Sequence, residues 1–320
     1  MKTTNNKSGK SVYKIITERV VAGLEKEGTK WFRPWTNDNG AKGYAINHAT
    51  KQYYKGINSL MLTGAIHEYG YTSLEFLTAK QIKEAGGTLN EGAECHLVVY
   101  WLVSYTYKNK WYKNEKALTQ ATGKTRRDTG VYSHAAPRYY KVYNLTDTKG
   151  VDSLTDAEIK KALEGTIFDC NTDAESVYSN MPKRPTLRHG GNKAYYRPSA
   201  HHVQMPTKKQ FKTKGVEGDY YKTLFHELVH STGNEDLLNR PSLTGFTNFG
   251  DEKYSKEELV AEMGSMFLVG LLDIETTEGD ENSQAYINSW IKELKKDENE
   301  KDVLFASIQA RKAVEYILQK

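Results

Sequence analysis

The sequence predicts an α+β protein built from two domains, and three observations indicate this. A run rich in β-forming residues at 95–105 has a candidate antiparallel partner at 138–145, with short helical patterns before it. Two strongly apolar helical patterns follow at 221–230 and 255–268. The third observation is a reversal of charge between the two halves of the chain.

Residues 1–150 hold 23 Lys and Arg against 12 Asp and Glu, whereas residues 151–320 hold 22 against 28. A basic half favours a polyanionic partner, and binding to such a partner weakens as salt is added. We therefore expect three segments: a flexible tail at 1–11, a first domain at 12–151 and a second domain at 152–320.

The composition is that of an ordinary globular protein, with 38% hydrophobic and 27% charged residues in a chain of 320. No apolar run approaches the roughly 18 residues that span a bilayer, and the polar start lacks the apolar segment of a signal peptide. We expect a cytoplasmic protein without a membrane partner. Cys95 and Cys170 are the two cysteines and lack C-x-x-C spacing, which argues against a disulfide framework and a cysteine zinc site.

The first domain begins with a helix, because apolar residues recur at helical spacing from Val12 to Leu24 and the pattern ends near Gly28. Three further segments follow in chain order: an aromatic loop around a proline at 31–35, a turn leading into a helix start at 50–62, and a short helix with a glycine stop at 78–87. The strands at 95–105 and 138–145 come next. Between them, 106–137 is basic and is predicted to be a long loop, either a solvated insertion or a functional one.

Aromatic rings gather in the same basic half: 14 of the 22 Tyr and four of the five Trp precede Gly150. Cations contact phosphates and aromatic faces stack on unpaired bases, so the combination favours single-stranded nucleic acid over duplex. No helix-turn-helix, zinc-finger or basic-zipper pattern indicates groove reading. The candidate DNA-binding residues are Trp31, Arg33, Trp35, Tyr53, Tyr54, Lys55, Asn58, Lys80, Lys108, Lys110, Arg126, Arg127 and Arg138.

The second domain opens with an acid-rich connector at 151–158 and has two expected strands, 187–198 and 201–206, with a glycine turn. A sheet edge beside a metal-binding helix can receive an extended peptide through main-chain pairing. Residues 283–319 are expected to form two amphipathic helices separated by the acidic stretch 296–300.

The strongest single motif is H-E-x-x-H at residues 226–230, inside an apolar helical pattern. His226 and His230 are four residues apart, so on a helix they project from one face and can bind the same metal ion. Glu227 lies on the same turn, where its carboxylate can act as a general base toward water. An imidazole in a packed core needs a partner, and metal and ordinary hydrogen bonds are the two alternatives.

Two residues compete for the role of third ligand. Glu258 lies in a helical pattern that we expect to begin with a Ser-x-x-Glu capping box at Ser255. Glu262 shares a face with Glu258 and can hydrogen-bond a liganding histidine, although both carboxylates also fit a solvated face. Asp236 is the second candidate, because the spacing H-E-x-x-H-x-x-G-x-x-D lets a glycine turn bring a ligand back. It ranks below Glu258, since its segment also fits an ordinary polar helix exit.

In their order along the chain, these motifs resemble those of the ArdC antirestriction family, whose N-terminal domain is also found in plasmid TraC-type primases. The resemblance covers nearly the whole chain from about Val12. It is carried by the segments Trp31-Phe32-Arg33-Pro34-Trp35, Tyr54-Lys55-Gly56-Ile57-Asn58, Thr78-Ala79-Lys80-Gln81 with Gly86-Gly87, Tyr143-Asn144, 226–233, 257–262, and Ala285-Tyr286-Ile287 with Trp290. The second half also resembles peptidases that cleave phage repressors, where Glu in an E-x-x-x-N/D helix is the third ligand. Glu258-x-x-x-Glu262 departs from that pattern by ending in Glu.

The resemblance implies an N-terminal single-stranded DNA-binding domain and a C-terminal zincin-like metallopeptidase domain, in a mobile-element protein that acts against host restriction. One Zn²⁺, or another divalent transition metal, is then expected at His226, His230 and Glu258, with Glu227 catalytic and Glu262 behind the ligands. The expected partners are single-stranded DNA and an unidentified protein substrate. The alternative is a DNA-protecting binder whose metal site is structural or regulatory.

Overall fold

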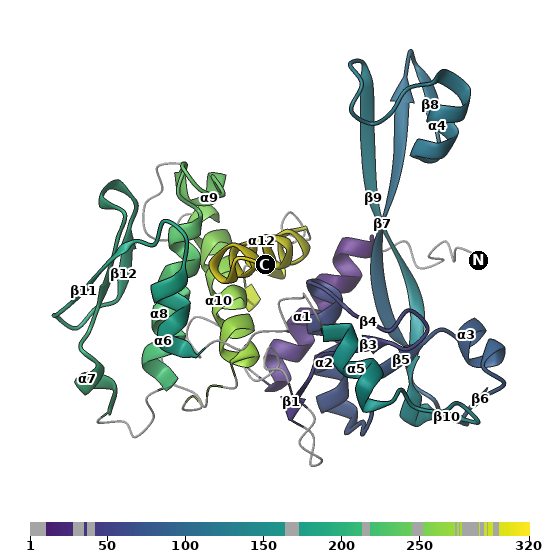
Figure 1. Cartoon of the computed structure of the whole chain (residues 1–320), viewed down its shortest axis with the longest axis horizontal. Helices are drawn as coiled ribbons and strands as arrows, with labels where there is room; N and C mark the ends of the chain where they lie inside the picture. Colours follow the sequence, from purple (N-terminus) through teal and green to yellow (C-terminus); the bar gives the residue numbers. More distant parts are fainter. Residues whose placement is uncertain are drawn as a thin grey trace.

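The structure is a computed structural model that describes residues 11–27, 35–36, 42–163, 173–212, 218–244, 252–272, 274, 276, 288, 291–292, 294–296 and 301–320. Figure 1 shows the long sheet of the N-terminal half on one side of the molecule and the helices of the C-terminal half on the other. The mixture of helices and sheets confirms the α+β class predicted from the sequence.

Three helices of the N-terminal half are α1 (Val12–Glu27), α2 (Ile57–Tyr69) and α3 (Ala79–Glu84). α2 ends at Gly70, whose left-handed φ of 62° lets its N–H bond back to the last turn. α3 begins with a capping box, in which Thr78 and Gln81 bond reciprocally through side chain and backbone. Local capping therefore fixes the end of α2 and the start of α3.

A six-stranded sheet forms the centre of the N-terminal half, in the order β4-β3-β5-β9-β7-β8. All neighbouring strands are antiparallel except β3 and β5. In chain order the strands are β3 (Ile46–Asn47), β4 (Gln52–Tyr53), β5 (Glu75–Leu77), β7 (His96–Tyr107), β8 (Lys110–Tyr112) and β9 (Val131–Asn144). Two smaller ladders pair β1 (Trp35–Thr36) with β2 (Lys42–Gly43), and β6 (Thr88–Leu89) with β10 (Thr148–Lys149).

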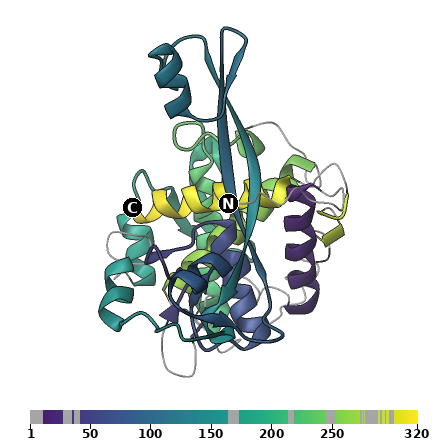
Figure 2. The same ribbon diagram turned by 90° about the vertical axis from the view of Figure 1, so that its right-hand side faces the viewer.

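The long strands β7 and β9 continue beyond the sheet as a projection that we call the arm, residues 100–138. Both views show it rising from the rest of the molecule (Figure 1, Figure 2). The two strands pair without interruption from His96 opposite Val142 to Tyr107 opposite Val131. The arm also carries β8 and the helix α4 (Glu115–Thr122).

The prediction of a long loop at 106–137 is therefore wrong for most of its length. Both ends of that stretch are strand: they begin or end with the β-forming residues Thr106, Tyr107, Val131 and Tyr132, and they pair with each other. In the middle, Asn114 caps the start of α4 and Gly123, with φ of 69°, caps its end.

The connector between the halves packs on the N-terminal sheet. After the 3₁₀ turn η2 (Leu145–Asp147), the carboxylate of Glu75 in β5 accepts hydrogen bonds from the hydroxyl of Ser153 and the N–H of Leu154. The helix α5 (Asp156–Leu163) follows, and Leu154 and Ile159 pack against the N-terminal core. A buried carboxylate thus anchors the start of this polar segment.

The C-terminal half combines a small sheet with long helices. In chain order its elements are α6 (Ala174–Asn180), β11 (Thr186–His189), β12 (Tyr195–Arg197), η3 (Pro198–Ala200), β13 (His202–Met205), α7 (Lys208–Lys212), α8 (Gly218–Thr232), α9 (Pro241–Thr244), α10 (Glu252–Leu271) and α12 (Asp302–Leu318). The sheet has the order β11-β13-β12, with β11 parallel and β12 antiparallel to β13.

Two details differ from the sequence prediction. The segment 187–198 forms two strands, because Gly190 and Gly191 adopt φ of 139° and 70° and break it. α10 begins at Glu252, three residues before Ser255, so Ser255 lies inside the helix and the predicted capping box is wrong. Of the two helices predicted at 283–319, α12 is the second, and most of the first lies outside the described residues.

A single apolar cluster joins the two halves. Val20 and Leu24 of α1 and Leu60 of α2 belong to the same cluster as the buried faces of α8, α10 and α12. α12, the last helix, contacts α1, α8 and α10. Within the part of the chain that the structure describes, no helix is both long and apolar enough to cross a membrane.

Candidate metal centre

The helix α8 holds the H-E-x-x-H motif in the core of the C-terminal half. Four apolar side chains of α8 are at most 2% exposed, and their burial fixes the rotation of the helix about its axis. They are Leu224, Phe225, Leu228 and Val229. His226 and His230, four residues apart, then point in the same direction from α8. The apolar frame predicted from the sequence therefore positions both imidazoles.

The helix α10 passes close to α8 because Gly264 lies at the contact. A Cβ atom at this position would be only 2.7 Å from Val229 Cγ2, so no larger residue fits without a shift. The missing side chain lets the two backbones approach. Two turns earlier on α10, this close approach brings Glu258 to the histidines of α8.

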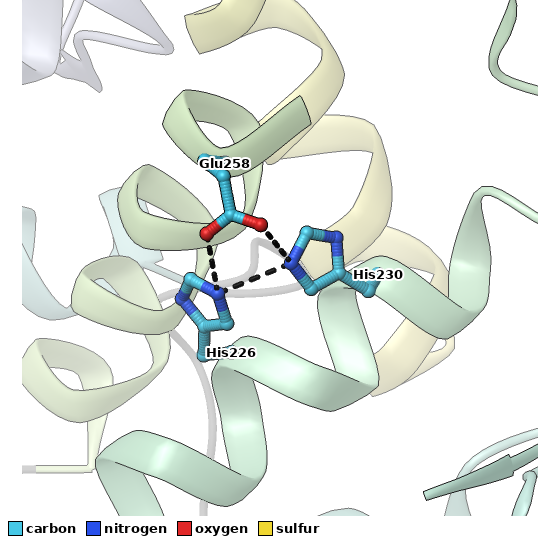
Figure 3. A group of neighbouring side chains, drawn as sticks. All are labelled: His226, His230 and Glu258. Atoms are coloured by element: carbon cyan, nitrogen blue, oxygen red, sulfur yellow. Dashed lines mark hydrogen bonds and ion pairs between the residues drawn. The ribbon is translucent and has the colours of Figure 1, made fainter. Parts of the chain in front are cut away.

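Three side chains converge between these helices, as Figure 3 shows. The Nε2 atoms of His226 and His230 are 3.1 Å apart. The two carboxylate oxygens of Glu258 lie 3.3 Å from His226 Nε2 and 3.2 Å from His230 Nε2. Among the described residues, these three form the one group of His, Cys, Asp and Glu side chains whose ligand atoms all lie within 4.8 Å of one another.

A second carboxylate stands behind each histidine. Behind His226, Glu262 Oε2 is 3.4 Å from Nδ1, and Lys222 Nζ is 3.4 Å from the other oxygen of Glu262. Behind His230, Glu257 Oε1 is 3.3 Å from Nδ1. Such contacts fix the orientation of a ring and leave its Nε2 free for a metal.

Glu257 is itself held by Arg240, which is 2% exposed. The Arg240 Nε donates to both oxygens of Glu257, at 3.1 Å and 3.0 Å, and its other nitrogens donate to Thr232 Oγ1 and the Val229 carbonyl. Ser242 Oγ donates to Glu257 at 2.5 Å. One guanidinium thus ties the end of α8 to α10.

Sequence reasoning did not single out Glu257 or Arg240. Glu257 precedes Glu258 in the same helical pattern, which was the one available signal. Arg240 lies in the turn after α8, and nothing in the sequence connects it to Glu257, because the pairing depends on the path of that turn.

The side chains of the cluster strongly shift one another's pKa values. Burial acts to lower the pKa of His230, but hydrogen bonds to Glu257 and Glu258 raise it to about 9. The pKa of His226 is also raised well above its usual value, despite burial, by Glu258 and Glu262. Conversely, His230 and Arg240 lower the pKa of Glu257 to about 2, against the opposing effect of burial. The site therefore has a strong affinity for positive charge.

Glu227 lies beside the cluster and outside it. The residue is 7% exposed, and burial raises the pKa of its carboxyl group. The backbone N–H of Tyr196 in β12 donates a hydrogen bond to it. β12 is an edge strand of its sheet and contacts α8, the helix that carries Glu227.

Asp236, the other candidate for third ligand, is exposed in the turn after α8. It does not belong to the group formed by His226, His230 and Glu258. The geometry therefore favours Glu258 over Asp236.

The candidate DNA-binding residues fall into two groups. Lys55, Lys80, Lys108, Lys110, Arg126, Arg127 and Arg138 are exposed. Five of these seven lie on the arm, and Lys55 and Lys80 lie on the body of the N-terminal half. Trp31 and Arg33 lie outside the described residues, as does the side chain of Trp35.

Three of the candidates are structural residues instead. Tyr53 and Tyr54 are only 5% and 7% exposed and belong to the N-terminal core, so their rings are not accessible to a base. The amide of Asn58 is bonded to the N–H and the carbonyl of Val99 in β7, at 2.7 Å each. We therefore reassign all three to the packing between the sheet and α2.

Comparison with known proteins is consistent with this division of the chain. Residues 10–143 match the N-terminal domain of the anti-restriction factor ArdC, and residues 173–308 match the zincin-like metallopeptidase family. The protein y4eC of Sinorhizobium fredii is 30% identical over 287 residues, which cover 90% of this chain and 85% of y4eC. A DNA primase TraC of Escherichia coli is 29% identical over 310 residues; these cover 97% of this chain but 27% of the primase.

Two crystal structures of the antirestriction protein ArdC from plasmid R388 share the fold. The metal-free form has a TM-score of 0.66 at 25% identity and covers 96% of each chain. The Mn(II)-bound form has a TM-score of 0.64 at 25% identity, covering 97% of this chain and 98% of that one. The present chain is therefore a member of the ArdC antirestriction family, with a zincin-like metallopeptidase domain in its C-terminal half.

Proposed function

We propose that this protein binds single-stranded DNA with its N-terminal half and hydrolyses peptide bonds with a metal-dependent site in its C-terminal half, during entry of a mobile element into a restricting host. The observation that carries the peptidase part is the convergence of His226, His230 and Glu258 beside the buried Glu227.

The donor set fits a divalent metal. Ligand atoms about 2.1 Å from a tetrahedral ion lie roughly 3.4 Å apart. The distances of 3.1, 3.2 and 3.3 Å in the cluster are close to that spacing. Two imidazoles and one carboxylate, with a fourth position open, are typical of catalytic zinc sites. Zn²⁺ is our first candidate, and the Mn(II)-bound form of the R388 relative makes Mn²⁺ the second.

The bound ion would supply Lewis acidity, lowering the pKa of water and polarising a carbonyl group. Glu227 would accept the proton of the attacking water and later deliver it to the leaving amine, since burial holds its pKa nearer to neutrality. An extended peptide would pair with the free edge of β12, because β12 has a neighbouring strand on one side only and contacts the helix that carries Glu227. Glu257 and Glu262 would keep the two imidazoles oriented.

The charge and ring content of residues 1–150 supports the DNA-binding part. The same half matches the N-terminal domain of ArdC, and the relative named DNA primase TraC carries a similar segment. Exposed cations of the arm are available for phosphates.

The decisive variant is Glu227→Gln, which removes the base without removing a ligand. Metal content of the purified protein should stay equimolar, while new peptide ends generated in extracts of a restricting host should fall by about 100-fold or more. Glu235→Gln, an exposed residue just after α8, is the matched control and should behave as wild type.

A second measurement separates the two functional alternatives. Plasmid entry into a restricting host should drop with Glu227→Gln and with His230→Ala if peptide hydrolysis is required. If Glu227→Gln protects the plasmid fully and His230→Ala does not, the metal site is structural and the protein is a DNA-protecting binder. Wild-type protein that binds no divalent metal would exclude both versions of the site.

A further inference from the structure

The arm has one face on which aromatic rings are aligned by strand register. Opposite residues of antiparallel strands point to the same side of a sheet. Thr106 of β7 is opposite Trp111 of β8 on one side and opposite Tyr132 of β9 on the other. The two rings therefore flank a small threonine on the same face, and neighbouring strands about 4.8 Å apart put them roughly 10 Å from each other.

These two rings are unusually accessible. Trp111 is 64% exposed and Tyr132 is 67% exposed, more than any other large apolar or aromatic side chain in the described part of the chain. Leu102, on the same face of β7, is 42% exposed. The opposite face is different: Tyr105 is buried there and α4 contributes the fully buried Leu118. Only one face of the arm is thus covered by its own helix.

Positive charge gathers at the tip of the arm, next to the exposed rings. Residues 100–138 contain eight Lys and Arg and only two acidic residues, Glu115 and Asp128. Lys108 lies in the turn before β8, with its Nζ 5.5 Å from the centre of the Tyr107 ring, and Lys110 precedes Trp111 in β8, so both cations lie at the edge of the exposed face. Arg138 is opposite Tyr100 and belongs to the same face as the two rings. No carboxylate belongs to this face, because Glu115 lies in α4 and Asp128 lies in the turn before β9.

We infer that this face is the subsite where bases of single-stranded DNA stack, with Trp111 and Tyr132 each receiving a different base and the neighbouring cations following the backbone. The inference rests on the proposed DNA-binding function and deepens it. Exposed rings beside cations are the combination that recognises unpaired nucleotides without a sequence code. A duplex offers no free base face to these rings, and the centre of a protein interface is usually depleted of charge.

The test is the affinity of the full-length protein for a fluorescein-labelled oligo(dT), measured by anisotropy. Trp111→Ala and Tyr132→Ala should each weaken binding about tenfold, and the double variant more, because each removes one stacking ring. Trp111→Phe with Tyr132→Phe should restore most of the affinity. Phe305→Ala, which removes a 46% exposed ring of α12, is the matched control and should leave binding unchanged.

The salt dependence of DNA affinity distinguishes base stacking from ionic contacts with phosphates. The double ring variant should keep the wild-type slope of affinity against salt concentration, whereas Lys108→Ala with Lys110→Ala should reduce that slope. If wild type binds oligo(dT) and the double ring variant binds equally well, the subsite lies elsewhere and this inference is overturned. If wild type does not bind oligo(dT) at all, the DNA-binding function itself fails.

Discussion

The metal centre and the arm position their side chains in opposite ways. At the metal centre, each histidine is fixed by a buried carboxylate that is itself held by a cation, Lys222 on one side and Arg240 on the other. On the arm, Trp111 and Tyr132 are more than 60% exposed and are positioned by strand register alone. A site that must hold an ion needs rigid geometry, whereas a surface that meets a flexible strand needs accessible rings. The following predictions test this contrast, from the largest expected effect to the smallest.

Arg240→Ala should cause the largest loss of stability. The substitution removes the guanidinium partner of the buried Glu257 carboxylate and removes donors to the end of α8, so the free energy of unfolding should fall by about 3–5 kcal/mol in urea denaturation. Arg126→Ala is the matched change on the arm, where the partner Glu115 is 4.0 Å away, and it should cost no more than about 0.5 kcal/mol. Equal losses would contradict the contrast.

Metal affinity should rise steeply with pH. Both histidines must be deprotonated to bind a metal, and their pKa values are raised, to about 9 for His230. Below that pH, each proton that metal binding releases should raise the metal affinity about tenfold per pH unit, so two protons should raise it roughly 100-fold. A competition experiment with a chelator measures this.

The stability of the metal-free protein should change with pH in the opposite direction. A raised histidine pKa stabilises the fold below about pH 6.5, and this contribution disappears as the pH rises to about 9.

Gly264→Ala should separate α8 from α10. The added methyl group meets Val229 at 2.7 Å, and the overpacking should lower the free energy of unfolding by about 1–2 kcal/mol and weaken metal binding at the same time. Combining it with Val229→Ala should recover part of the metal affinity. A loss of stability with unchanged metal binding would show that the spacing of these helices does not control the ligand geometry.

Variants of the arm face should have the smallest effect on stability. Trp111→Ala and Tyr132→Ala remove rings that are already exposed, so the free energy of unfolding should change by less than about 0.5 kcal/mol. Thermal unfolding of the same samples used for DNA binding measures this. A large loss would mean that the rings support the arm itself.

The sequence predicted the parts of the site that depend on local periodicity. His226 and His230 share a face of α8 because they are four residues apart, and Glu258 and Glu262 share a face of α10 for the same reason. Arg240 and Glu257 were missed because their pairing depends on where the turn after α8 leads. The same limit applies to Asn58. Its side-chain amide forms two hydrogen bonds with the backbone of Val99, and the sequence alone does not reveal this partner.

The sequence predictions that failed in the N-terminal half failed for a related reason. Tyr54 was expected to contact DNA because tyrosines and lysines are close together in the sequence, but its hydroxyl accepts a hydrogen bond from Asn47 inside the core. Residues 106–137, most of the arm, were expected to be a loop because their polar composition offers no core of its own. Within the arm, the paired residues of β7 and β9 are 24 to 38 residues apart in the sequence, so the ladder that stabilises the arm is not visible locally.

The continuity of β7 links the two sites mechanically. This strand runs from the tip of the arm to Val99, which belongs to the same apolar cluster as the zincin-like helices α8 and α10. A nucleic acid bound at the tip of the arm and a polypeptide bound at the metal centre would then be kept at a fixed distance from each other. Proteins bound to the same DNA strand would then reach the metal centre most often, so the peptide-binding site itself would need little sequence selectivity.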